Sequence, residues 1–147
     1  MGETLSLTER LESLKAGVIA GGMAAFAEGL FQVGQGQWLA NVGLLGSAAP
    51  HFDGLFAGYL AIAGLSGFLF GVTCRYAIRE DHNPHLSSGV VLAFGLVRGL
   101  AQVNLEDVTP QMGPLILFAV FESIGVFAIA YLGLSTALRW GWVKFCR

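Results

Sequence analysis

Residues 16–33, which read AGVIAGGMAAFAEGLFQV, decide the fold because they are long and apolar enough to cross a membrane and carry only one charge, Glu28. Just before them, Ser6 and Glu9 form the S-x-x-E capping-box pattern that marks the start of a helix. The pattern predicts a helix that begins near Ser6 at the membrane surface and enters the bilayer near Ala16.

Three further apolar runs, at 53–72, 86–103 and 113–138, are each long enough to span the hydrocarbon core. The 34–52 segment, which opens with Gly-Gln-Gly, is Gly-rich and too short to span, so it is predicted to be a loop with an interfacial half-helix. The predicted fold class is therefore an all-α membrane protein with four transmembrane helices, forming a single domain over residues 1–147.

The composition agrees with a lipid bilayer as the main partner of the chain. Hydrophobic residues make up 54% and charged residues only 12%, about half the charged share of a soluble domain. Eight Lys and Arg residues against ten Asp and Glu leave no basic stripe, which excludes a nucleic-acid partner. Two cysteines are too few for a disulfide scaffold.

The basic residues predict the orientation. With four spans, every Lys and Arg except Arg98 falls on one face, which the positive-inside rule makes the cytoplasmic or stromal side. Both termini are therefore predicted on that side, with Trp140 and Trp142 in its interfacial belt. The residues on that face are Arg10, Lys15, Arg75, Arg79, Arg139, Lys144 and Arg147.

Two parts of the sequence also resemble each other, as in an internal repeat. Residues 14–19 (LKAGVI) match residues 86–91 (LSSGVV), and residues 28–33 (EGLFQV) match residues 98–103 (RGLAQV). The match predicts two tandem helical hairpins in parallel repeat, related by an axis along the membrane normal, over about 6–76 and about 86–142. Glycines at small-xxx-small spacing are predicted to pack the helices together: Gly17, Gly21, Gly29, Gly67, Gly71, Gly95 and Gly99.

Three charges, Glu28, Arg98 and Glu122, lie inside the predicted spans and reach one depth, about 17–18 Å from the basic face at 1.5 Å per residue. Gln32 and Gln102, one turn further along, point the same way. One interpretation is an ion pair between Glu28 and Arg98 that fixes the packing register. The other uses the surplus negative charge, which must bind a proton, a cation or a cofactor, with Glu122 as the neutral, proton-carrying member.

Nothing else in the sequence predicts chemistry. The three histidines, His51, His82 and His85, lie in predicted loops, so a tetrapyrrole ligand within a helix has little support. No nucleophile–base set, phosphate loop or metal motif occurs. The sequence therefore predicts no catalytic residues, no metal, no cofactor and no enzymatic activity.

Three runs, FGVTCRY at 70–76, REDHNPHL at 79–86 and AFGLVRGL at 93–100, are similar to a family of small uncharacterised integral membrane proteins of cyanobacteria that has relatives in chloroplasts. The resemblance implies a thylakoid or plasma-membrane location. It implies no established activity and supplies no catalytic residues.

Three functions remain open from the sequence. The first is a non-enzymatic auxiliary that assembles or stabilises a larger membrane complex, for example a photosynthetic one, through the 75–86 segment and the amphipathic N-terminus. The second is a small proton- or ion-coupled transporter that works as a homodimer and uses Glu28, Arg98 and Glu122. The third is a pigment-binding protein.

Overall fold

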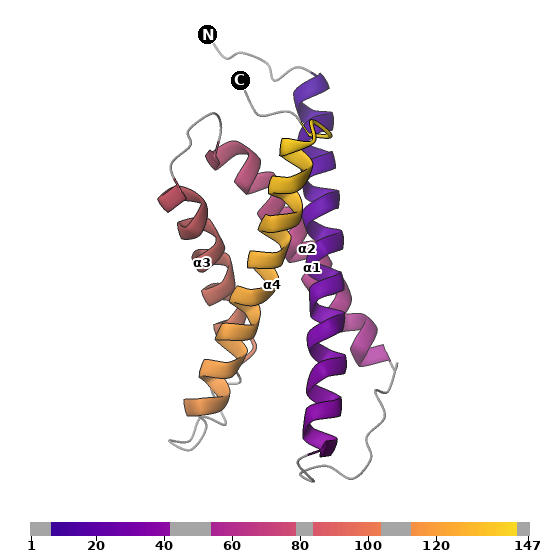
Figure 1. Ribbon diagram of the computed structural model, residues 1–147, viewed down its shortest axis with the longest axis vertical. Helices are drawn as coiled ribbons and strands as arrows, with labels where there is room; N and C mark the ends of the chain where they lie inside the picture. Colours follow the sequence, from indigo (N-terminus) through magenta and orange to yellow (C-terminus); the bar gives the residue numbers. More distant parts are fainter. Residues whose placement is uncertain (1–6, 42–53, 79–83, 104–112, 144–147) are drawn as a thin grey trace.

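The computed structural model describes residues 7–41, 54–78, 84–103 and 113–143, which form four helices arranged as two antiparallel hairpins (Figure 1). The beginning of α1 and the end of α4 lie at the same end of the molecule, here named the terminal end. The predicted all-α fold class is confirmed. The helices are α1 (Leu7–Asn41), α2 (Gly54–Ile78), α3 (Pro84–Ala101) and α4 (Gly113–Arg139).

Helix α1 is longer than its apolar run predicts, because it continues through both glycines of the Gly-Gln-Gly sequence to Asn41. A glycine inside a helix costs only about 1 kcal/mol relative to alanine, and this stretch contains no proline to end the helix. Gln35, between the glycines, also bonds to Glu122 on α4. The predicted break at residues 34–36 is therefore wrong, and residues 42–52 of the predicted loop with its interfacial half-helix lie outside the described residues.

Three of the helices are long and apolar enough to cross a membrane, over Leu7–Gln35, Gly54–Ala77 and Ile116–Arg139. Helix α3 is apolar but shorter, with 18 residues. Large apolar side chains stand on the outer surface of the bundle, where Val18 is 65% exposed and Val97 is 71% exposed. Such a surface needs an apolar environment, so the chain is a membrane protein.

Small residues let α1 and α2 approach closely. A Cβ added at Gly71 would lie 2.5 Å from the carbonyl oxygen of Ala16, and one at Gly21 would lie 2.8 Å from the carbonyl oxygen of Gly64. A Cβ at Gly67 would also meet backbone of α1. Helices in lipid associate through such packing, because lipid supplies no hydrophobic force between them.

The second hairpin has the same kind of interface. A Cβ at Gly99 would lie 2.6 Å from the Cα of Val120, and one at Gly95 would lie 2.8 Å from the Cα of Ile124. Backbone atoms cannot rotate away as a side chain can, so any larger residue at these two positions must push α3 and α4 apart.

Two of the glycines singled out in the sequence are less constrained. A Cβ at Gly29 would make ordinary contact with Leu60 at 3.5 Å. A Cβ at Gly17 would meet the ring of Phe68, which is a side chain able to move. A larger residue at these positions is therefore more easily accommodated.

Aromatic rings join the two hairpins. Phe70 of α2, Phe94 of α3 and Phe127 of α4 pack together with ring centroids 5.1–5.6 Å apart. Helix α1 packs on α2 and on α4, and in the described part of the chain it does not pack directly on α3. Toward the end opposite the terminal end, the two hairpins diverge (Figure 1).

Candidate functional site

Two buried charges from different hairpins, Glu28 and Arg98, form an ion pair. The Nη2 of Arg98 on α3 lies 3.0 Å from the Oε2 of Glu28 on α1, and the two side chains are 9% and 2% exposed. A single charge in that position would be costly to bury, whereas a hydrogen-bonded pair compensates much of the desolvation. The pair connects α1 and α3, the two helices that do not pack on each other directly.

Both oxygens of the Glu28 carboxylate are hydrogen-bonded. Arg98 donates to Oε2, and the Nε2 of Gln32, one turn further along α1, donates to Oε1 at 3.1 Å. The i to i+4 spacing places Gln32 on the same helix face as Glu28. The carboxylate is therefore enclosed by donors from α1 and α3.

A second group of bonds joins α3 to α4 through Ser123, whose side chain is fully buried. The Nη1 of Arg98 donates to the Ser123 hydroxyl oxygen at 3.3 Å, and the Nε2 of Gln102 donates to the same oxygen at 2.9 Å. The Nε of Arg98 is buried and has no hydrogen-bond partner among the described residues. The guanidinium thus keeps one unused donor inside the bundle.

Glu122 lies beside this network and is bonded differently. Its Oε2 accepts a hydrogen bond of 2.6 Å from the Nε2 of Gln35 on α1. Glu122 is only partly buried, and it lies within electrostatic range of both Glu28 and Arg98. The polar layer formed by these side chains therefore holds two carboxyl groups and one guanidinium. Its members are Glu28, Gln32, Gln35, Arg98, Gln102, Glu122 and Ser123.

The polar layer brings together most of the residues singled out in the sequence. Glu28, Arg98 and Gln32 are directly bonded, whereas Gln102 reaches Ser123 and Glu122 reaches Gln35. Arg98 lies within the last turn of α3, near Ala101. On α3 the layer is therefore closer to the end opposite the terminal end.

Sequence reasoning missed Ser123 and Gln35. Ser123 had a visible signal, since it follows the only charge in an apolar run. Gln35 lies seven residues after Glu28, on the same helix face, but the turn predicted at its flanking glycines hid that relation. Continuing the helix through 34–36 would have placed it in the layer.

A second buried polar group lies at the terminal end and corrects the expected position of Arg75. This residue was predicted in the connection between two spans, but it lies in the last turn of α2 and is only 3% exposed. Its Nη1 donates to the carbonyl oxygen of Glu9 at 2.9 Å and to the hydroxyl oxygen of Ser13. The Ser13 hydroxyl also lies 3.1 Å from that of Tyr76. These bonds hold the end of α2 to the beginning of α1.

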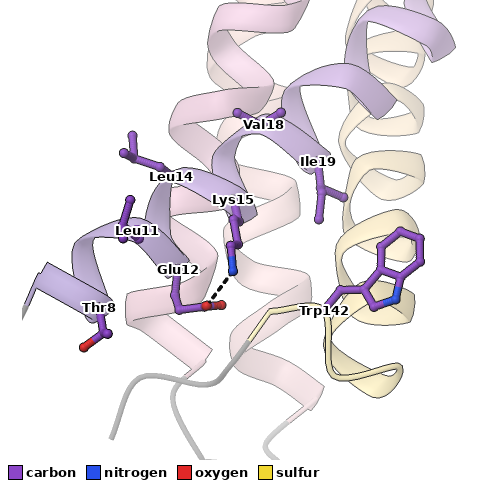
Figure 2. A pocket seen from close by; sticks show the side chains of 8 residues that line it. All are labelled: Thr8, Leu11, Glu12, Leu14, Lys15, Val18, Ile19 and Trp142. Carbon is purple, nitrogen blue, oxygen red and sulfur yellow. Dashed lines mark hydrogen bonds and ion pairs between the residues drawn. The ribbon is translucent and has the colours of Figure 1, made fainter.

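An open apolar groove runs along the outer face of α1 at the terminal end (Figure 2). Trp142, on the segment after α4, lies across from Lys15 and Ile19, and the Nζ of Lys15 forms a 2.8 Å ion pair with Glu12. Apolar walls with a charged rim are typical of the boundary between lipid headgroups and acyl chains. The remaining lining residues are Thr8, Leu11, Leu14 and Val18.

No group of three or more metal-ligating side chains comes together within the described residues. His85 lies in the first turn of α3 rather than in a loop, while His51 and His82 fall outside the described ranges. No family model, curated protein or solved structure matches the chain.

Proposed function

We propose that the chain crosses the membrane four times, with α3 as the shortest span. The 18 residues of α3 rise about 27 Å, close to the hydrocarbon thickness of about 30 Å. Four spans also keep every Lys and Arg except Arg98 on the cytoplasmic face. With both hairpins inserted in the same orientation, Glu28 and Arg98 occupy matching positions of the predicted repeat.

Cysteine labelling tests this topology. In a cysteine-free background, a cysteine at Asn104 should react with a membrane-impermeant reagent from the side opposite to one at Lys144. Labelling of both positions from the same side would contradict four spans.

Within this topology, the chain is a non-enzymatic auxiliary that assembles or stabilises a larger membrane complex. The observation that carries this proposal is that both oxygens of the Glu28 carboxylate are bonded within the bundle, to Arg98 and to Gln32, so this ion pair holds helices together. Buried pairs commonly specify geometry in this way. The family resemblance supports a thylakoid or plasma membrane as its location, and a photosynthetic complex as the partner.

Blue-native electrophoresis of the tagged full chain tests the auxiliary role. The wild type and Lys15→Ala, which alters only an exposed ion pair, should migrate with a large complex. Arg98→Ala should lose that migration because the bundle is disturbed. A wild-type band at the mass of one chain or of a homodimer would contradict the proposal.

One observation favours a second candidate, a proton- or ion-coupled carrier. Glu122 is bonded to an amide rather than to the guanidinium, which leaves the layer with more carboxyl groups than cations. Intramembrane carboxyl groups of this kind mark proton and ion pathways. Vesicles containing the wild type should then show a proton or ion flux that Glu122→Gln abolishes, and equal flux from both proteins and empty vesicles would reject this candidate.

A further inference from the structure

The guanidinium of Arg98 lies at the centre of the polar layer, and not all of its N–H donors are hydrogen-bonded. Its Nη2 holds Glu28 on α1 and its Nη1 holds Ser123 on α4, but its buried Nε has no hydrogen-bond partner in the described chain. A charged N–H donor enclosed in a protein strongly favours an acceptor, and carboxylate is the acceptor that matches guanidinium best. The spare donor therefore suits a second carboxylate.

Glu122 is the carboxyl group placed to supply that acceptor. It precedes Ser123 on α4, and Ser123 already contacts Arg98. The charged groups that act on Glu122 are Glu28 from α1 and Arg98 from α3. Helix α2 meets α4 through Phe70, which does not titrate. A negative charge on Glu122 would thus be repelled by Glu28 and attracted by Arg98.

We infer that Glu122 is a reversible proton-binding site, and that its ionised carboxylate turns from Gln35 to the Nε–H of Arg98. In the protonated form, the Glu122 carboxyl oxygen accepts from Gln35 and ties α1 to α4. Loss of the proton to water leaves a carboxylate that competes with Glu28 for the same guanidinium. The ligand of the site is a proton, and its release weakens the bond between the two hairpins.

The direction of proton exchange follows from the position of the layer. Arg98 lies within the last turn of α3, and Gln102, which follows that helix, is exposed. The layer therefore meets water at the end opposite the terminal end. This inference rests on the proposed crossing of the membrane by α4.

Infrared difference spectroscopy of the full chain in phosphatidylcholine vesicles tests the inference. The wild type should show, near neutral pH, a carboxylic-acid C=O band that disappears as the pH is raised. The band should be missing in Glu122→Gln and retained in Glu12→Gln, a control at the exposed ion pair. No such band in the wild type, or an unchanged band in Glu122→Gln, would overturn the inference.

Two further variants test the partners of Glu122. Arg98→Lys keeps a positive charge but removes the Nε donor, so the titration midpoint of the band should rise by about one pH unit. Glu28→Gln removes the repelling carboxylate and should lower the midpoint. A midpoint that is the same in Arg98→Lys and the wild type would reject the role given to Arg98.

The cysteine labelling at Asn104 and Lys144 separates the two proposals. Labelling from one side would reject the membrane topology itself. Labelling from opposite sides, together with a missing C=O band, would leave the topology intact and reject only proton binding by Glu122.

Discussion

Replacing Arg98 by alanine leaves the Glu28 carboxylate, which is 2% exposed, with Gln32 as its remaining side-chain donor. Removing one partner of a buried ion pair costs about 3–5 kcal/mol, because the other charge stays buried without compensation. Changing Glu28 and Arg98 together to glutamine removes both charges. The cost should then fall to about 1 kcal/mol for each hydrogen bond that the amides do not re-form.

The two variants should therefore differ by about 2 kcal/mol or more in the free energy of unfolding. Thermal unfolding in detergent, followed by circular dichroism, measures the difference, and immunoblotting of the tagged protein measures accumulation in the membrane. Lys15→Ala is the matched control, since an exposed ion pair contributes less than about 1 kcal/mol. Equal destabilisation by Arg98→Ala and the double glutamine variant would show that Glu28 and Arg98 do not compensate each other's buried charge.

Three other substitutions test the packing and the polar layer by the same melting experiment. Gly99→Val should destabilise the bundle by about 1–3 kcal/mol, because its Cβ meets the backbone of α4; Gly89→Ala, with open space around it, should be neutral or stabilising. Phe127→Ala should lower the free energy of unfolding by about 3–5 kcal/mol because it removes the aromatic contact between the hairpins, and a decrease of less than about 1 kcal/mol would contradict that role. Ser123→Ala should cost about 1–3 kcal/mol because the buried Nη1 of Arg98 and the Nε2 of Gln102 lose their acceptor, and an unchanged melting temperature would show that these bonds add nothing.

Much of the helical architecture could be predicted from the sequence, because each apolar run is long enough to be a helix and turn-forming residues separate most of them. The predicted repeat also put Glu28 and Arg98 at matching positions, and their side chains lie 3.0 Å apart. In lipid, a buried charge needs a nearby partner, so the few charges of an apolar chain indicate which helices lie close together.

Other features depended on tertiary contacts that local patterns do not encode. Two glycines around Gln35 indicated a turn, but the helix continues and its side chain bonds to α4. Arg75 was assigned to a connection by counting charges, yet Ser13 and a carbonyl group of α1 draw it into the bundle. Ser123 is an ordinary helix residue until the guanidinium of Arg98 reaches it.

Solid-state NMR of the full chain in lipid bilayers can detect the Glu28–Arg98 ion pair itself, by measuring dipolar coupling between ¹⁵N-labelled arginine guanidinium groups and ¹³C-labelled glutamate carboxyl groups. The Arg98 signal is assigned by its loss in Arg98→Lys. If the ion pair forms, Arg98 should couple strongly to the Glu28 carboxyl carbon, as an Nη2–Oε2 distance of 3.0 Å requires. An Arg98 guanidinium that couples to no carboxyl carbon, and instead has lipid acyl chains as its nearest neighbours, would contradict it.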